Sequence, residues 1–410
     1  MGTAWFNEDP DIRTEFKDLK IEKIPEITTA YWVDADGNKT TILPYGTDRV
    51  GIYIKGKNLS GKEAKIRVFD SDWGLFNDDC MVNIVVDFDS DEETTYFELT
   101  AKVFEKGEQG GNKGNEGTLE LYFNIEIDEY LDEEFRNSTE EQLQVHVVRY
   151  IPRLMREKGW NMGASLQEEW FSRKKSKSSD RPTENTPVTD LIKMNWVLSF
   201  PRAKAVYDKI IREETWINEA AKVVLSGELK KMKKDGKLVL PQKEGELVDF
   251  GVFDPTLITY THIKDGKIQS PAYDKYYFQR EGHKESLLSA IWNGASALDD
   301  LFAALGDFIF RIIAGGTITK KGGNYIIHIT KLGIYVRDNF DFIGFQPLGY
   351  WNIARGEIAT YPKPEHYFIT NGSYRDYRKV FEMGEDFTVY SDIKYEPVNG
   401  SFSVPLSSLD

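Results

Sequence analysis

Val50-Gly-Ile-Tyr-Ile54 places an aliphatic side chain at every second position, and Ala64-Lys-Ile-Arg-Val-Phe69 repeats the pattern. This period of two is typical of β-strands that bury one face. Outward from these two stretches, the same pattern recurs from Glu26 to Asp128, in residues 29–33, 81–88, 96–104 and 118–127. About seven strands in roughly 100 residues predict an all-β immunoglobulin-like sandwich, for which a disulfide is not required.

Helical patterns begin after the strands. Ser138 and Glu141 form a capping box ahead of the apolar positions Leu143, Val147 and Ile151, so we expect a helix there. Further helices are expected over 162–171, 202–212 and 218–234, with a short strand over 238–240. Beyond residue 246 the pattern mixes a helix over 296–306 with long strands over 308–313 and 325–336, joined by a turn at 320–323. The fold class expected is therefore multidomain, with the sandwich followed by a helical connector and an α+β C-terminal domain.

The expected division of the chain has five parts. They are a leader (1–25), the sandwich (26–130), a helical region (137–240), an α+β region expected to be the effector (246–396) and a C-terminal tail (397–410). Residues 1–140 hold 15 Lys and Arg against 32 Asp and Glu, a net charge of −17, whereas the rest of the chain has a net charge of +2. This asymmetry supports a boundary near 135–140, and the acidic half is expected to repel nucleic acid.

Several classes of protein are excluded by composition. A single cysteine, Cys80, allows neither an internal disulfide framework nor a multi-cysteine zinc module. No apolar run approaches the ~18 residues of a transmembrane segment, and the N-terminus lacks the apolar core of a signal peptide, so we expect a protein made in the cytoplasm. The P-loop, GxGxxG, HExxH and GxSxG motifs are also missing.

The strongest chemical signal is Tyr335-Val-Arg-Asp-Asn-Phe-Asp-Phe342, at the end of an expected strand. A turn there would let Asp338 and Asp341 converge, either to hold a divalent metal or to divide acid and base roles. Asp and Asn are also ordinary turn residues, and this alternative stays open. An Asp-rich stretch over 70–91 offers oxygen ligands for Ca²⁺ but lacks the EF-hand order, so a solvated surface is the competing interpretation.

A second group of candidates lies downstream. Arg375 and Arg378 are three residues apart and would share one face of a helical turn, which suits phosphate capture by guanidinium groups. The alternative is that they pair with nearby carboxylates, Asp376, Glu382 or Asp386. His366 precedes them by a few residues.

Residues 143–396 resemble an uncharacterised bacterial domain family encoded beside VgrG, PAAR and other type VI secretion genes. The motifs that carry this resemblance are Ile151–Trp160, Leu166–Phe171, Met194–Leu198, Ala297–Gly306, Gly333–Phe342, Gln346–Trp351, Ser373–Arg378 and Asp386–Asp392. The leading sandwich resembles immunoglobulin-like modules that precede effector domains in Bacteroidetes. The resemblance implies an antibacterial effector that is secreted by an injection machine without a signal peptide. Its partners would be VgrG/PAAR-type spike or tube proteins and an immunity protein.

A second resemblance covers residues 303–342, through Ala304-Leu-Gly-Asp-Phe308 and the later Asp-x-aromatic-Asp-Phe pattern. These look like the catalytic end of colicin M-type bacteriocins, metal-dependent hydrolases that cleave lipid II in the target periplasm. It implies that Asp338 and Asp341 are the catalytic carboxylates and the ligands of Mg²⁺ or another divalent cation. Arg375 and Arg378 would then grip the lipid-linked phosphates, and His366 would be the proton donor. The rival expectation is a non-enzymatic adaptor or structural component of the injection apparatus.

Overall fold

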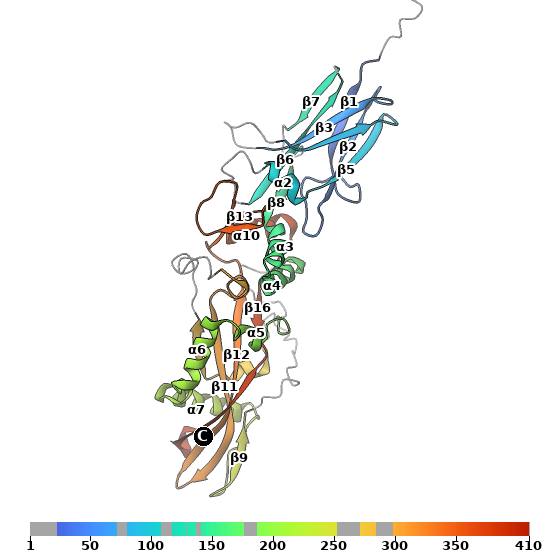
Figure 1. Ribbon diagram of the computed structural model, residues 1–410. Helices are drawn as coiled ribbons and strands as arrows, with labels where there is room; N and C mark the ends of the chain where they lie inside the picture. The colour runs from blue at the N-terminus through green and yellow to red at the C-terminus, as the bar shows by residue number, and fades with distance from the viewer. Residues whose placement is uncertain are drawn as a thin grey trace, which may run out of the picture. The chain divides into compact units, whose positions relative to one another are not determined.

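The computed structural model describes most of the chain, in eight segments. They are residues 23–71, 80–107, 117–128, 130–136, 141–175, 187–251, 271–283 and 298–409. The chain divides into two compact units: residues 1–111 with 119–145, and residues 112–118 with 146–410 (Figure 1). The cap expected at Ser138 and nearly all of the expected leader lie outside the described residues.

Unit 1 is an immunoglobulin-like sandwich of two antiparallel sheets. One sheet has the order β1-β2-β5, with β1 (Glu26–Val33), β2 (Arg49–Lys57) and β5 (Glu92–Glu98). The other has the order β4-β3-β6-β7, with β8 also paired to β6; its strands are β3 (Glu63–Asp70), β4 (Cys80–Asp87), β6 (Thr118–Ile127), β7 (Leu131–Phe135) and β8 (Leu143–His146). Trp32 of the first sheet is fully buried against Phe123 of the second, with ring centroids 5.1 Å apart. The period-two pattern therefore identified this core correctly.

Two local expectations in this part of the chain were wrong. The strand expected over 96–104 ends at Glu98, and helix α2 (Ala101–Gly107) follows, because the amides of Val103 and Phe104 bond back to the carbonyl of Thr100. The helix expected from residue 138 is replaced at Leu143–His146 by strand β8, which adds to β6, a partner that local periodicity cannot reveal.

Unit 2 joins the expected helical and α+β regions in one compact body. Its helices are η1 (Val147–Tyr150), α3 (Ile151–Glu157), α4 (Asn161–Ser172), α5 (Met194–Val197), α6 (Pro201–Arg212), η2 (Thr215–Ile217), α7 (Glu219–Lys234), η4 (Ala272–Tyr276), α9 (Asp300–Ala304), α10 (Asn371–Phe381) and η6 (Leu406–Ser408). The expected helices over 162–171, 202–212 and 218–234 are thereby confirmed, whereas the strand expected at 238–240 does not form. None of the helices in the described segments has both the length and the apolar character needed to cross a membrane.

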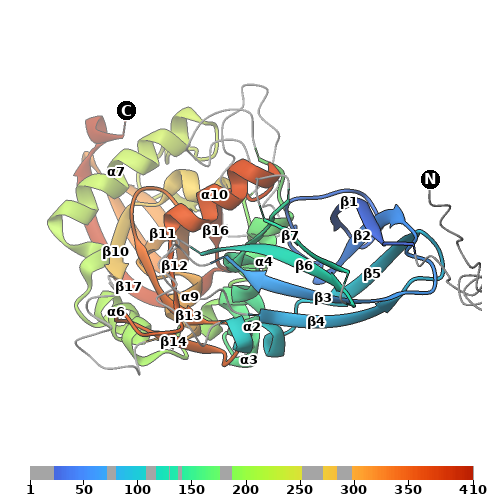
Figure 2. The same ribbon diagram turned by 90° about the horizontal axis from the view of Figure 1, so that it is seen from above.

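A six-stranded antiparallel sheet forms the core of unit 2. Its central hairpin joins β11 (Phe308–Lys321) to β12 (Asn324–Phe340), and its outer strands are β9 (Leu247–Phe250), β10 (Gln279–His283), β16 (Phe387–Tyr390) and β17 (Lys394–Pro405). Helices α6 and α7 lie along this hairpin in both views (Figures 1 and 2), and Tyr207 of α6 packs on Phe310 of β11 with ring centroids 6.0 Å apart. Strand β17 pairs with β12 across most of its length, so the segment expected to be a C-terminal tail completes the sheet.

Glycine permits two features of the long hairpin. The turn at Gly322 and Gly323 uses positive φ angles of 59° and 81°, as the sequence predicted. The register shifts between Gly315 and Gly316, where any Cβ on Gly316 would collide with the carbonyl of His328. A third, small sheet has the order β14-β13-β15, with β13 (Pro347–Asn352), β14 (Glu357–Ala359) and β15 (Tyr367–Thr370).

Candidate functional site

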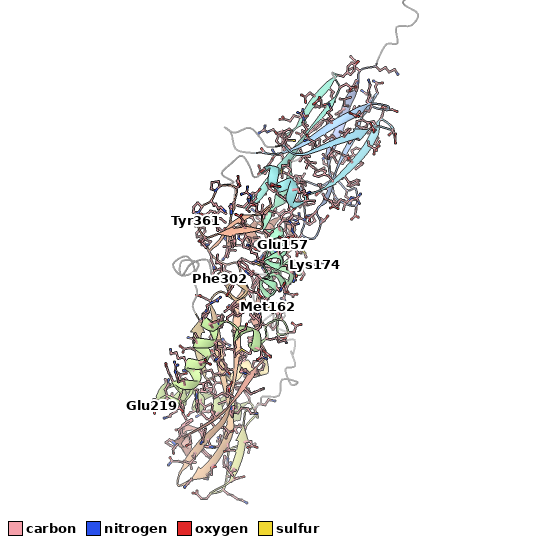
Figure 3. All side chains as sticks on the ribbon, in the orientation of Figure 1. Glu157, Met162, Lys174, Glu219, Phe302 and Tyr361 are labelled. Carbon is pink, nitrogen blue, oxygen red and sulfur yellow. The ribbon has the colours of Figure 1, made fainter. Side chains whose placement is uncertain are left out.

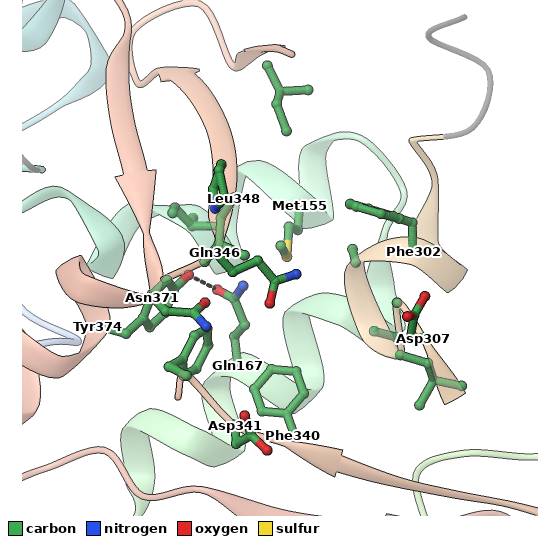
Figure 4. Close-up of a pocket in the computed structure, with 18 of the residues that line it drawn as sticks. Met155, Gln167, Phe302, Asp307, Phe340, Asp341, Gln346, Leu348, Asn371 and Tyr374 are labelled. Carbon is green, nitrogen blue, oxygen red and sulfur yellow. Dashed lines mark hydrogen bonds between the residues drawn. The ribbon is translucent and has the colours of Figure 1, made fainter. Parts of the chain in front are cut away.

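Unit 2 contains a cavity of about 850 Å³. Residues of α3, α4 and α9 line it together with the end of β12, the loop that follows β12, and the small β13–β15 sheet (Figure 4). Most of the lining is apolar, with rings from Trp160, Phe302, Phe340 and Trp351 among others. A cavity of this size and composition is typical of small-molecule sites.

Three acidic residues, Asp307, Asp338 and Asp341, are among those that line this cavity. Register explains their grouping: β11 and β12 pair from Ile309 opposite Arg337, so Asp307 and Asp338 both lie at the open end of the hairpin. The strand continues through Phe340, held there by β16, and Asp341 is the first residue after it. The structure therefore brings Asp338 and Asp341 to one cavity, although the turn begins later than the sequence predicted.

The electrostatic environment of these carboxyl groups is unfavourable for negative charge. Burial raises the pKa of Asp338 well above its usual range; the amide of Asn339 and the charge of Arg337 oppose the shift, while the charges of Asp341 and Asp307 add to it. Burial also raises the pKa of Asp341; a hydrogen bond from the Ile343 amide and the charge of Arg378 oppose this shift, and the charge of Asp386 adds to it. Perturbed carboxyl groups in a cleft are typical of functional sites.

Carboxamide and aromatic side chains form another wall of the cavity. Gln167 of α4 accepts a hydrogen bond of 2.9 Å from the hydroxyl of Tyr374, whose ring stacks on Phe342 with centroids 3.8 Å apart (Figure 4). Asn371 donates from Nδ2 to the carbonyl of Ile343 at 2.9 Å. These contacts fix the loop after β12 against α4 and α10.

Helix α9 is clamped to the start of α4. The carboxylate of Asp300 accepts from the amides of Met162 at 3.1 Å and Gly163 at 2.8 Å, which lack partners within their own helix. Gly163 permits close packing, because a Cβ there would press on Ala303. Phe302 and Met162, labelled in Figure 3, mark this junction, which positions both helices as cavity walls.

The two candidate arginines have partners in the protein and do not line the cavity. Arg375 donates from Nη1 to the carbonyls of Phe342, at 2.7 Å, and Gly344, at 2.5 Å, so it secures the loop that forms the cavity wall. Arg378 forms an ion pair with Asp386, which also accepts from Trp170 Nε1 at 2.9 Å. The pairing with Asp386 is the alternative that the sequence left open for Arg378.

His366 also lies away from the cavity lining. Its side chain is fully buried beside the small sheet, and Nδ1 donates to the carbonyl of Pro364 at 2.8 Å. Its Nε2 is 3.6 Å from a carboxylate oxygen of Glu357, which pairs with Lys363. As placed here, the imidazole does not reach the carboxylates of the cavity, and its role as proton donor stays a prediction.

The fit of a divalent cation can be judged from the donor set. Within the described segments no group of three or more His, Cys, Asp and Glu side chains is arranged to hold a metal. Asp338 and Asp341 supply two carboxylates, so a cation there would need further oxygen ligands from a substrate, as Mg²⁺ often does. A self-sufficient metal site is not formed by these residues.

Sequence reasoning missed several residues of the cavity, namely Asp307, Gln167, Gln346 and Asn371. Asp307, Gln167 and Gln346 lie inside or beside motifs that carried the family resemblance, so those motifs signalled the site without indicating a role. Only the folded chain shows that they share one cavity.

The comparisons with known proteins add a family assignment. Neither the curated proteins nor the solved structures contain a match to this chain. A family model described as a family of unknown function, DUF6402, matches residues 147–405, which include every residue that lines the cavity. Because this match covers more than half of the chain, the protein belongs to the DUF6402 family.

Proposed function

We propose that this protein is an antibacterial effector whose unit 2 hydrolyses an amphiphilic substrate in the cavity, with Asp338 and Asp341 dividing the acid and base roles. One observation carries the proposal. Two carboxyl groups without ion-pair partners in the described segments lie at one end of a cavity that is otherwise mainly apolar. A protein interior retains such groups at a cost in stability, so a chemical role is the simplest reason for them.

The apolar part of the substrate would contact the aromatic side chains of the cavity. The loop after β12 extends this apolar surface to solvent, because Ile343 is 45% exposed and Phe345 is 77% exposed. Scattered exposed apolar residues are ordinary, but here both belong to the lining of the cavity. The loop therefore suits an amphiphile whose apolar part enters from outside.

The chemistry follows from the carboxyl pair. One group, protonated, gives its proton to the leaving oxygen or nitrogen as the bond to it breaks. The other, ionised, takes a proton from water as the water oxygen forms the new bond. The two groups then exchange protons with solvent, so the site returns to its starting state without a net change of charge.

The colicin M resemblance points to a lipid-linked pyrophosphate as substrate. The cavity suits the lipid part of such a substrate better than its phosphates. Its rings suit a long hydrocarbon chain, but its described lining contains no Lys, Arg or His to balance phosphate charge. A phosphate-bearing substrate would therefore have to bring a divalent cation, which would neutralise charge on the leaving group. The acid and base steps of the carboxyl pair do not require a metal. Measuring activity with and without added Mg²⁺ shows whether the substrate brings one.

Direct expression in a susceptible bacterium tests the proposal. The full chain, with and without an export signal, is expected to kill from the periplasm. Asp338→Asn and Asp341→Asn should each lower turnover by roughly 10²–10³, the usual cost of one positioned electrostatic group, and so abolish killing. Asp190→Asn is the matched control, because Asp190 is exposed and outside the cavity lining.

Two outcomes would contradict the proposal. Wild-type chain that harms no cell from either compartment would favour the adaptor function. Killing that is undiminished in both variants, with each confirmed as folded by its melting temperature, would remove the carboxyl pair from the mechanism.

Delivery is the second part of the proposal, with the acidic sandwich as the module that loads onto a spike or tube protein. It rests on the resemblance and on the net charge of −17 over residues 1–140. A chain without residues 1–145 should fail to kill when supplied by injecting donor cells. The same shortened chain, which also lacks residues 112–118 of unit 2, should remain toxic when exported directly, and this toxicity checks that unit 2 still folds.

A further inference from the structure

The charges around the cavity are of one sign. Asp307, Asp338 and Asp341 line it, whereas its described lining includes no Lys, Arg or His. An anionic ligand entering this cavity would meet acidic side chains and no basic side chain of the described lining, in a medium that screens poorly. The preferred ligand is therefore neutral or cationic in the part that reaches these carboxylates.

The hydrogen-bonding groups at this wall are mostly acceptors. Asp341 accepts from the amide of Ile343 at a long 3.4 Å, and neither Asp338 nor Asp341 has an ion-pair partner within the described segments. The nearby cation Arg378 is already paired with Asp386. The ionised member of the pair has about four lone-pair positions, so most of its accepting capacity is unused.

Asn371 provides an independent indication. It is 2% exposed, lines the cavity, and uses its Nδ2 on the carbonyl of Ile343. Its Oδ1 has no hydrogen-bond partner among the described residues, although buried polar atoms are nearly always paired. This acceptor, like the carboxylates, would be satisfied by a donor that the protein does not supply.

Aromatic rings lie beside the acceptors. Phe340 and Phe342 flank Asp341 in sequence, and both line the cavity with Trp351. Ring faces attract organic cations, most strongly where water is excluded. Carboxylates, an unpaired carbonyl oxygen and rings together match an ammonium group on an apolar body.

We propose that the cavity binds a primary ammonium group attached to an apolar chain, and that the substrate of this site is an ammonium-bearing amphiphile. The ammonium donates to Asn371 and to the ionised member of the pair Asp338 and Asp341, while the chain occupies the aromatic part of the cavity. A divalent cation is the competing occupant, but it would receive only two of its ligands from Asp338 and Asp341. The inference deepens the proposed function by naming the class of its substrate.

Calorimetric titration of the full chain at pH 7 with n-octylammonium, octan-1-ol and octanoate tests this inference. The three probes share the apolar chain and differ in the head group. Octylammonium should bind at least tenfold more tightly than octanol, and octanoate should not bind measurably. Equal affinity for all three, or preference for octanoate, would overturn the inference.

Variants locate the site. Asp338→Asn and Asp341→Asn should each weaken octylammonium binding at least tenfold, and Asp190→Asn should leave it unchanged. Octyltrimethylammonium, which keeps the charge but donates no hydrogen bond, should bind less tightly than octylammonium. Unchanged binding in both variants, or tight binding of Mg²⁺ with no binding of octylammonium, would contradict the assignment.

These results are separable from the test of the proposed function. Octylammonium binding without toxicity would support the ligand and contradict the effector. Toxicity that depends on Asp338, without binding of octylammonium, would support the effector and contradict the ligand.

Discussion

Two sites in unit 2 differ in how the protein satisfies the carboxyl groups that they contain. Asp274 of η4 is buried and fully partnered: Arg311 Nη1 lies 2.6 Å from both of its oxygens, and the hydroxyls of Tyr335 and Tyr390 donate to it at 2.5 and 2.9 Å. Asp338, three residues after Tyr335 on the same strand, lines a cavity and forms no ion pair within the described segments, although the charge of Arg337 acts on it. The closed network satisfies every oxygen it buries, whereas the open pair leaves its charge to be satisfied by a ligand.

The difference separates a structural role from a functional one. Removing one member of a closed network leaves the others buried and unpaired, so such residues report on stability. Removing a buried carboxyl group that lacks an ion-pair partner removes its desolvation cost and so does not destabilise the fold. The effect of such a substitution is therefore expected on binding or catalysis. The three predictions below test this distinction, from the largest expected effect to the smallest.

Asp274→Ala should lower the free energy of unfolding of unit 2 by about 3–5 kcal/mol, because Arg311 loses its counter-charge while buried. Urea titration of the full chain measures the effect. Asp235→Ala is the matched control: Asp235 also pairs with a lysine and a tyrosine hydroxyl, Lys275 and Tyr276, but at the surface, and little change is expected. Similar losses in the two variants would show that burial of the network does not matter.

His146 extends the comparison to a buried base. Burial lowers its pKa to about 4, with a smaller opposing effect from Asp376 and a smaller reinforcing one from Arg149, and its ring packs against Tyr377 and Phe381. The unfolded chain, with a histidine pKa near 6.5, binds the proton first, so this contribution to stability is complete above pH 6.5 and is lost as the pH falls toward 4.

The loss should approach about 3 kcal/mol, since each unit of pKa is worth about 1.4 kcal/mol. The free energy of unfolding is measured for wild type and His146→Gln at several pH values. The difference between the two proteins isolates the contribution of His146, because both share the same titrating carboxyl groups. Parallel pH profiles for the two proteins would contradict the assignment.

Asp338→Asn should change stability least and in the opposite direction to Asp274→Ala. At pH 7 the free energy of unfolding should rise by less than about 1 kcal/mol, because the neutral amide of the variant avoids the cost that burial imposes on the ionised carboxyl group. Thermal unfolding of the full chain measures the change. A loss of unfolding free energy as large as that of Asp274→Ala would show that Asp338 has a structural role, and would contradict the distinction between the two sites.

Much of the fold was predictable because its signals are local. Alternating side chains such as those of 64–69 mark strands, and the spacing of apolar residues in 162–171 and 218–234 marks helices, whatever lies elsewhere in the chain. Leu143–His146 shows the limit: its apolar spacing fits a helix, but the available edge of β6 makes it a strand. Likewise, the segment expected to be a tail was recognisable as a strand only beside β12.

The sequence by itself determined the strands of the sandwich and the candidate pair Asp338 and Asp341, since these depend on neighbours within a few residues. It also determined the acidic character of residues 1–140, which is a matter of composition alone. Only the tertiary structure decided which polar groups meet. It placed Asp307 and Asn371 at the same cavity as that pair and directed Arg378 to Asp386 instead. The physical reason is that hydrogen bonds and charges act over a few ångströms in space, and the folded sheet, rather than separation along the chain, sets those distances.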